Sequence, residues 1–402
     1  MRVLCTCLPG LGHFHPMVPL ARALVGAGHE VAFATAAAFC PAIEQAGFTA
    51  YSAGMSLPAQ LEEARRRFPE EAALFGQERF VQFVPRMLAG VAAPSRLAEL
   101  VAVVHQWRPD VLVHDETELA GPVAAAVAGI PSAAQSVLIL RPLEMTRRAG
   151  EILAPLAEQW GVDVGPFAGL FNYLYLDVCP PSLQSAEIEE VEVAHSVHNV
   201  DLAPAADHVV PPWVDTLEPP TVYVSLGTVF NQNHHVFAAI LKALAEEPLT
   251  LILTIGNDND PAVFGPQPSN VHIQRYIPQS LLLGHCDLVI NQGGTAILPI
   301  LSHGLPLLVL PQGANQFHNA EACVRAGAAR SLLPAEVDPA AVRAEVHRLL
   351  GQPRYREGAQ RVQAEIKAMP GPAEGVRLLE RLQREGAPLT KAASAGATGA
   401  RP

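Results

Sequence analysis

Half of the 402 residues are hydrophobic, so the chain is long and apolar enough for two domains with large cores. The formal net charge of −12 argues against a nucleic acid or an anionic membrane as partner, because both favour a basic surface. Six scattered cysteines show neither the spacing of a zinc site nor that of a disulfide framework, and we expect free thiols in a reducing cytoplasm.

The hydropathy pattern does not predict membrane insertion. Pro9-Gly10 interrupts the N-terminal apolar run too early for a secretory signal peptide. No apolar stretch is long enough to span a bilayer, and glycines and prolines break the region from Leu119 to Leu140. These observations predict a soluble, cytoplasmic protein.

The beginning of the chain predicts a strand, a helix and a second strand, at Val3–Leu8, Leu20–Ala27 and Glu30–Thr35. Gly10 and Gly12 start a GxG pattern, so a dinucleotide-binding site has to be considered. The third glycine is missing, however, and Thr35 stands where an acidic residue is expected at the end of the second strand. NAD is therefore not the expected ligand.

The next segments continue this alternation less clearly. Residues 55–108 are mostly helical in pattern, a strand is predicted at Asp110–His114, and Asp115 follows it. Residues 140–200 look irregular. Their aromatic side chains fit either an acceptor pocket or an ordinary core, and the residues alone do not decide which.

A proline-rich segment, residues 208–220, separates two α/β patterns and is predicted to be a linker. After it, strands predicted near 222–226, 249–255, 271–273, 287–290 and 307–310 alternate with helices, as in a second doubly wound unit. Asp338-Pro339 is a typical helix start. A last helix is predicted over 374–384, and the tail from Gly386 has the composition of a disordered segment.

The turn Gly293-Gly294-Thr295 lies between a buried strand and a helix. Glycines there allow the backbone to approach a ligand, and the first N–H groups of a helix lack partners within the helix. This arrangement favours a phosphate group.

Four segments in the same order carry a resemblance to a known family: PGLGHFHPMVPLARALVGAGHEVAFAT, PTVYVSLGTVF, NVHIQRYIPQSLLLGHCDLVIN and LSHGLPLLVLPQGANQFHNA. Together they resemble the family 1 nucleotide-sugar glycosyltransferases with the GT-B fold, especially bacterial enzymes that glycosylate antibiotics. The resemblance implies an α/β fold with two doubly wound, Rossmann-like domains facing a central cleft. We expect an acceptor domain over 1–207, the linker over 208–220, a donor domain over 221–371, a helix over 372–385 that crosses back, and a disordered tail over 386–402.

The family match makes His13 the general base and Asp115 its acidic partner. A neutral imidazole suits this role because its ordinary pKa is near neutrality. The residues alone do not rank His13 far above His15 or His114. A loop histidine and a helix-capping aspartate remain the plain structural alternative.

The same match predicts where the substrates bind. The expected donor-binding residues are Ser225, Gly227, Thr228, Tyr276, Ile277, Gln279, Gln292, Gly293, Gly294, Thr295, Asn315 and Gln316. The expected acceptor-binding residues are Gly12, Phe14, Phe80, Phe83 and Phe171. For Ser225 to Thr228, an ordinary structural turn is the alternative.

Among the departures from the family pattern, three bear most directly on the donor. Gln292 replaces the histidine that binds the diphosphate, and an amide donates hydrogen bonds without becoming cationic. Ile300 stands where many UDP-sugar enzymes have a glutamate for both ribose hydroxyls, which favours a dTDP-sugar. Asn315 replaces the aspartate that holds sugar hydroxyls, which fits a deoxygenated or amino-bearing sugar better than glucose.

The sequence thus predicts an inverting glycosyltransferase that moves a deoxyhexose from a dTDP-sugar, or a UDP-sugar, to a hydroxyl of an apolar small molecule. No metal or other cofactor is expected, because Asp258-Asn259-Asp260 is the nearest approach to a metal motif and looks like a turn. A homodimer is left open. The alternatives are a nucleotide-sugar 2-epimerase of the same fold and a non-catalytic partner protein of another transferase.

Overall fold

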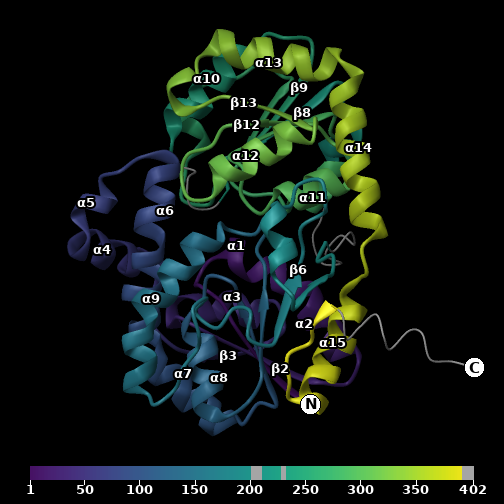
Figure 1. Ribbon diagram of the computed structural model, residues 1–402. Helices are drawn as coiled ribbons and strands as arrows, with labels where there is room; N and C mark the ends of the chain where they lie inside the picture. Colours follow the sequence, from purple (N-terminus) through teal and green to yellow (C-terminus); the bar gives the residue numbers. More distant parts are fainter. Residues whose placement is uncertain (201–210, 228–231, 392–402) are drawn as a thin grey trace, which may run out of the picture. The chain divides into compact units, whose positions relative to one another are not determined.

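The computed structural model describes residues 1–200, 211–227 and 232–391. The chain forms two compact units (Figure 1). The first comprises Met1–Cys179, Gln184–Asn199 and the chain from Met369 onward, and the second comprises Pro180–Leu183 and Val200–Ala368. Each unit contains one parallel sheet covered by helices, so the expectation of two parallel α/β domains is confirmed.

The first sheet has seven strands in the order β3-β2-β1-β4-β5-β6-β7. Its strands are β1 Arg2–Thr6, β2 Glu30–Thr35, β3 Thr49–Ser52, β4 Val111–Asp115, β5 Ser132–Gln135, β6 Leu174–Asp177 and β7 Ala194–Ser196. The strand order reverses between β1 and β4. In open α/β sheets, ligands bind at the carboxyl ends of the strands beside such a switch point.

Helices cover both faces of this sheet. They are α1 Leu11–Phe14, α2 Val18–Gly26, α3 Cys40–Gln45, α4 Leu57–Arg67, α5 Pro69–Ala72, α6 Gly76–Met87, α7 Ala93–Trp107, α8 Ala120–Ala128, α9 Leu143–Gln159 and α15 Pro372–Glu385. Leu4 packs on one face with Leu97, and Val3 packs on the other face with Leu379. Successive side chains of a strand point to opposite faces, which explains this division.

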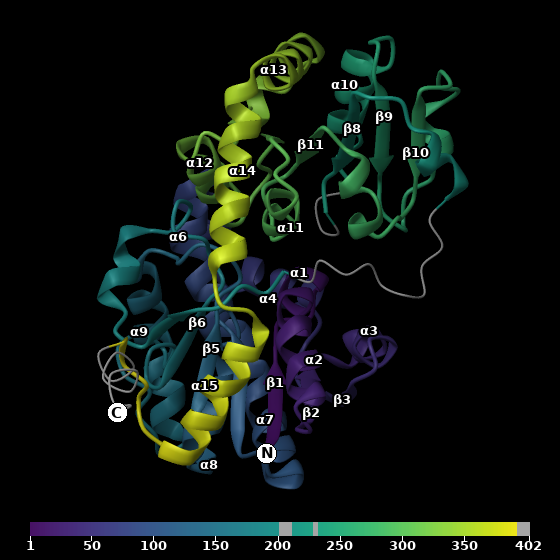
Figure 2. The same ribbon diagram turned by 90° about the vertical axis from the view of Figure 1, so that its right-hand side faces the viewer.

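The C-terminal helix α15 lies against α2 (Figures 1 and 2). Gly375 allows the close approach, because a Cβ atom there would lie 2.8 Å from Leu20 Cδ1. The chain after α15 stays attached to the first unit: Leu389 is fully buried, and its backbone N–H donates to the Tyr173 carbonyl (2.8 Å). The expected disordered tail is therefore wrong for residues up to 391, and residues 392–402 lie outside the described part.

A continuous helical run from Gly76 to Trp107 joins α6 and α7 through a π-helical turn, Leu88–Ala92. Among the described residues it is the one helix that is long and apolar enough to cross a membrane by composition. Of its most apolar 18-residue window, 67% is buried inside the protein, as in the core helix of a folded unit.

The region expected to be irregular contains the 17-residue helix α9. Gly150 and Pro155 weaken its sequence signal, because both residues disfavour helix interiors. The glycine is required by packing, since a Cβ atom at Gly150 would lie 2.2 Å from the Pro166 carbonyl oxygen.

The second sheet has six strands in the order β10-β9-β8-β11-β12-β13. Its strands are β8 Thr221–Ser225, β9 Thr250–Thr254, β10 Val271–Gln274, β11 Leu288–Asn291, β12 Leu307–Val309 and β13 Ala329–Ser331. Its helices are α10 His234–Leu244, α11 Ile297–Ser302, α12 Gln316–Arg325, α13 Pro339–Gly351 and α14 Pro353–Ala368. The switch point of this sheet lies between β8 and β11.

Short 3₁₀ turns connect many of these elements: His15–Met17, Ala37–Phe39, Ala186–Glu190, Pro212–Thr216, Pro261–Phe264, Gln279–Leu281, Leu283–His285 and Pro334–Glu336. The predicted start of α13 is confirmed, because Asp338 accepts hydrogen bonds from the backbone N–H groups of Ala340 and Ala341 (2.8 and 2.9 Å). Part of the expected linker, residues 208–210, lies outside the described residues.

Candidate active site

His13 lies on α1, directly after the end of β1 at the first switch point. Gly10 precedes the helix in an extended conformation, and its carbonyl accepts the backbone N–H groups of His13 and Phe14 (3.0 Å each). The predicted acceptor residue Gly12 lies in the same turn. The short helix therefore places the imidazole at the carboxyl edge of the sheet.

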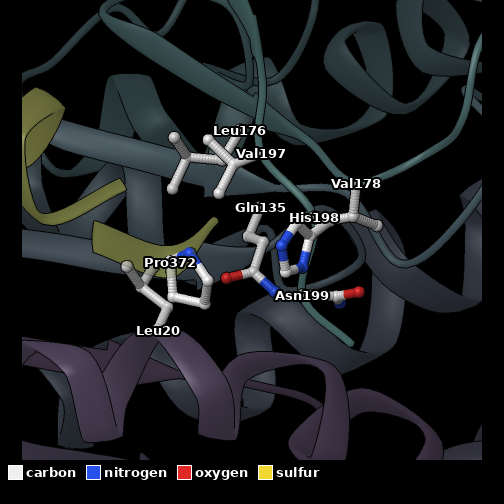
Figure 3. Close-up of a pocket in the computed structure, with 8 residues that line it drawn as sticks. All are labelled: Leu20, Gln135, Leu176, Val178, Val197, His198, Asn199 and Pro372. Atoms are coloured by element: carbon white, nitrogen blue, oxygen red, sulfur yellow. The ribbon is translucent and has the colours of Figure 1, made fainter. Parts of the chain in front are cut away.

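The 3₁₀ turn after α1 is fixed through one backbone carbonyl. Pro16 O accepts hydrogen bonds from Gln135 Nε2 (2.7 Å) and Asn199 Nδ2 (3.0 Å). Figure 3 shows both amide side chains grouped with His198 at a small hollow bordered by Pro372. Both amides therefore support the turn that follows α1.

Asp115 is the last residue of β4, the neighbouring strand at the switch point. Its Oδ1 atom lies 3.3 Å from His13 Nδ1. The His13 side chain is 26% exposed, whereas that of Asp115 is 2% exposed. An accessible imidazole backed by a buried carboxylate is the arrangement of a general base with an orienting partner.

The Asp115 carboxyl is ionised although it is buried. Burial raises its pKa, but the charge of His13 and hydrogen bonds from His13, Thr117 and the Leu8 backbone outweigh burial and lower the pKa from 3.8 to about 2. The Leu8 N–H donates to Oδ2 at 2.8 Å. The carboxylate is therefore negative throughout the neutral range.

The fold distinguishes among the three histidines that the residues alone did not rank as candidates for the general base. His114 is fully buried, its Nδ1 lies 3.1 Å from the Asp115 backbone carbonyl, and burial lowers its pKa to about 4. His15 is exposed on the turn after α1. His13 combines an accessible ring with a carboxylate against Nδ1.

Thr117 is a member of this group that sequence reasoning missed. Its hydroxyl lies 3.1 Å from His13 Nδ1 and donates to Asp115 Oδ1. Its backbone N–H also donates to Asp115 Oδ1 (2.7 Å). The available signal was the spacing Asp-x-Thr, which permits a turn closed by the aspartate side chain.

A buried ion pair supports the same region and was also missed. Arg96, which is 1% exposed, donates to the Cys7 carbonyl (2.8 Å) after β1 and lies 3.5 Å from Glu118. Glu118 in turn accepts the backbone N–H groups of Ala120 and Gly121 at the start of α8 (3.1 and 2.9 Å). The pair links the end of β1 to the segment after β4.

Most of the expected acceptor side chains pack inside the first unit. Phe14 is 2% exposed and makes an edge contact with Phe33, while Phe80 and Phe83 are 4% and 1% exposed. In this structure they offer almost no surface to an acceptor, because other side chains already cover them. Phe171 is half-buried against Tyr175, with ring centroids 5.3 Å apart.

In the second unit, the segments after β8 and β11 come together at the switch point. Ser225 ends β8, and its hydroxyl accepts the Gly227 N–H (3.4 Å). Gly227 has a φ of +72°, and a Cβ atom there would lie 2.2 Å from Gln292 Nε2. The amide of Gln292 therefore occupies space that only glycine leaves open. Thr228 lies outside the described residues.

The turn at Gly293 is held by two asparagines. Asn291 Oδ1 accepts the Gly293 N–H (3.0 Å), and Asn319 Nδ2 donates to the Gly293 carbonyl (2.8 Å). Gly293 has a φ of +89°, and a Cβ atom there would lie 2.9 Å from Val309 Cγ1. The helix α11 starts only at Ile297, after Gly294 and Thr295, and has six residues, so its dipole contributes less than expected.

The segment after β10 offers an aromatic face and an amide. Tyr276 is 52% exposed, whereas Ile277 is 6% exposed. The buried Nε2 atom of Gln279 has no hydrogen-bond partner among the described residues. An exposed ring beside an unpaired amide donor suits a nucleoside, which has a flat base and hydroxyl groups.

Asn315 and Gln316, the two side chains expected to bind the sugar, have different surroundings. Gln316 is 4% exposed, and its Oε1 accepts the backbone N–H groups of Gln312 and Gly313 (2.7 and 3.0 Å). Asn315 is half-buried at the start of α12. The oxygen of Gln316 is thus committed to the preceding loop. Ile300 is fully buried in α11.

Comparison with known proteins decides the family. The model of the erythromycin biosynthesis protein CIII-like N-terminal domain matches residues 22–227, and that of the corresponding C-terminal domain matches residues 238–382. The chain belongs to the CIII-like family of antibiotic glycosyltransferases. As such, it is an enzyme of family 1 with the GT-B fold.

This glycosyltransferase is 33% identical to L-demethylnoviosyl transferase from Streptomyces niveus, over 93% of the chain and 96% of the relative. It is 28% identical to aclacinomycin-T 2-deoxy-L-fucose transferase from Streptomyces galilaeus, over 96% of the chain and 97% of the relative. Among solved structures, spinosyn rhamnosyltransferase SpnG complexed with thymidine diphosphate has 27% identity and a TM-score of 0.78, over 94% of this chain and all of that chain. The names of these relatives are those of natural-product sugar transferases, and one of the solved structures was determined with thymidine diphosphate bound.

Proposed function

We propose that this glycosyltransferase moves a deoxyhexose from a dTDP-sugar to a hydroxyl of an apolar natural product, with inversion at the anomeric carbon. The observation that carries the proposal is the pair of His13 and Asp115 at the first switch point, 3.3 Å apart. An alcohol is a weak nucleophile at neutral pH, and a base that takes its proton as the new bond forms is what the reaction needs.

In the proposed mechanism, His13 Nε2 takes the proton of the acceptor hydroxyl while that oxygen attacks the anomeric carbon. Asp115 is negative and nearly fully buried, so it stabilises the imidazolium that forms. Attack from the face opposite the leaving diphosphate inverts the anomeric configuration. The nucleoside diphosphate leaves with the electron pair of the broken bond.

The second unit is proposed to hold the donor. Tyr276 would stack on the base, Gln279 would donate to the ribose, and the turn around Gly293 would receive the diphosphate with Gln292. The buried Ile300 provides no carboxylate for a ribose 2′-hydroxyl, which favours the deoxyribose of dTDP. The thymidine diphosphate complex of the similar SpnG supports the same choice.

The acceptor class rests on the relatives and on the first unit. One solved structure of SpnG, 28% identical to this chain, contains the spinosyn aglycone. Phe171 remains the most accessible of the aromatic side chains expected to contact an acceptor. We therefore propose a hydroxylated, largely apolar aglycone.

The proposed reaction uses no metal ion. Asp260 accepts the Ala262 N–H (3.1 Å), and Asn259 lies in the same turn with its amide bonded to the Ile255 carbonyl. These side chains form a local turn, as the sequence predicts. Turnover is expected to be unchanged after treatment with EDTA, and a loss restored by a divalent cation would contradict this part of the proposal.

The test combines donor binding with product analysis. Calorimetric titration should give clearly tighter binding of dTDP than of UDP, and NMR of the product should show an inverted anomeric centre. The assay uses a panel of hydroxylated aglycones with dTDP- and UDP-deoxyhexoses. Tighter binding of UDP would overturn the donor, and a retained configuration would overturn the mechanism.

A further inference from the structure

The hydroxyl of Thr117 occupies the space where His13 and Asp115 meet. It lies 3.1 Å from His13 Nδ1, which is shorter than the 3.3 Å between Nδ1 and Asp115 Oδ1. Hydrogen bonds from N–H to O normally span about 2.7–3.2 Å. The threonine oxygen is therefore the better placed partner of the imidazole.

Asp115 Oδ1 is already well supplied with donors. It accepts the Thr117 backbone N–H (2.7 Å) and the Thr117 hydroxyl, and His13 Nδ1 is its third neighbour. One carboxylate oxygen has about two lone-pair sites. His13 thus competes for an acceptor whose positions are filled by Thr117.

The direction of each hydrogen bond follows from the chemistry of the groups. An ionised carboxylate only accepts, so the single hydroxyl proton of Thr117 points to Asp115. The Thr117 oxygen then faces His13 with a lone pair. Both neighbours of Nδ1 are acceptors, and the proton of a neutral imidazole must reside on Nδ1.

We propose that Thr117 is a positioning residue that fixes His13 in the tautomer with a proton on Nδ1 and a free lone pair on Nε2. This inference rests on the proposed function, because the free Nε2 is the atom that would take the acceptor proton. In free imidazole side chains the opposite tautomer is the more populated one, so the protein has to select the reactive form. Asp115 supplies the charge, and Thr117 supplies the acceptor that locks the ring.

The first experiment compares Thr117→Val with Thr117→Ser in steady-state kinetics. Valine keeps the shape and removes the hydroxyl, and we expect kcat to fall by about tenfold, the effect of one lost hydrogen bond, with KM for both substrates unchanged. Thr117→Ser should retain kcat within about threefold. Thr49→Val, an exposed threonine at the edge strand β3, serves as the matched control and should behave as the wild type. Wild-type kcat in Thr117→Val would overturn the inference.

A double-mutant cycle shows whether Thr117 acts through His13. In a His13→Gln background, Thr117→Val should cause no further loss, because the group that it positions is gone. A full tenfold loss in that background would assign Thr117 a role independent of His13 and would refute the inference.

Nitrogen NMR of the His13 ring reads the tautomer without turnover. The wild type should show a protonated Nδ1 and an unprotonated Nε2. Thr117→Val should show a mixture that contains some of the other tautomer, because only Asp115, at 3.3 Å, then faces Nδ1. The same mixture in the wild type would refute the inference even if kcat fell. Full activity of His13→Gln would instead reject the proposed base, whereas an inactive His13→Gln with fully active Thr117→Val would reject only the role of Thr117.

Discussion

The two sheets reverse their strand order in the same way, but their switch points carry different chemistry. Between β1 and β4 lie a titratable imidazole and a buried carboxylate, His13 and Asp115. Between β8 and β11 lie neutral groups, among them Ser225, Gly227 and Gln292. The same backbone arrangement therefore carries different side chains after its strands, and we propose that these give the two switch points different tasks.

Burial explains why the two switch points tolerate such different residues. A carboxylate as buried as Asp115 needs several hydrogen bonds, and the backbone N–H groups of Leu8 and Thr117 together with the Thr117 hydroxyl provide them. A diphosphate brings its own negative charge, so its site needs donors and open space. In the proposed donor site, glycines with positive φ, such as Gly227 and Gly293, leave that space open.

The strongest test of this contrast is the removal of the base. His13→Gln keeps a polar side chain of similar size but cannot take a proton, so kcat should fall by about 10²–10⁴-fold while dTDP affinity stays unchanged. Rate and nucleotide titration measure the two effects separately. His15→Gln, on the exposed neighbour, is the control, and a larger loss there than at His13 would contradict the assignment.

The pH dependence of the free energy of unfolding reports on the ionisation of Asp115 at the first switch point. The folded pKa of Asp115 is about 2 and thus below its ordinary value of 3.8, so its ionisation stabilises the fold above pH 4, and this stability is lost as the pH falls toward 2. The contribution amounts to about 2 kcal/mol. Urea unfolding between pH 5 and pH 3 should show a steeper loss in the wild type than in Asp115→Asn. Parallel curves would argue against a depressed pKa.

The glycine at the second switch point should matter for binding and not for the proton transfer. Gly227→Ala forces a residue with a Cβ atom into a positive φ and displaces the Gln292 amide, so dTDP affinity should weaken by roughly tenfold or more. Calorimetric titration with dTDP measures this change of affinity. Gly284→Ala is the matched control in the same unit, because nothing lies within 4 Å of a Cβ atom there. Equal dTDP affinities of the two variants would show that nucleotide binding does not depend on the space that Gly227 leaves open.

The smallest expected effect is that of the neutral amide itself. Gln292→Ala removes one uncharged hydrogen-bond donor, so dTDP should bind about two- to tenfold more weakly, with the pH profile of kcat unchanged. The exposed Gln352→Ala provides the comparison. A change of the pH profile would mean that the switch points do not divide the work as proposed.

Several predictions from the sequence were wrong where tertiary packing outweighed the local signal. Phe14 and Phe83 were expected to contact the acceptor, yet they are buried, because an aromatic side chain in a pocket and one in a core follow the same sequence pattern. The helix α9 was missed because Gly150 and Pro155 weaken its local signal, whereas tertiary packing at Pro166 requires the glycine. The tail beyond Gly386 has a disordered composition, but the buried Leu389 anchors it.

The sequence by itself determined the alternation of buried strands and helices, the two α/β units and the family, because these depend on periodicity and on ordered motifs. Only the tertiary structure decided which histidine faces the carboxylate. Pairing of β1 with β4 brings residues 13 and 115 together across about a hundred positions of the chain. The tertiary structure also placed the Thr117 hydroxyl beside both residues. Because the Asp115 carboxylate only accepts, the hydroxyl proton is directed to Asp115, and the hydroxyl oxygen is left to accept from His13.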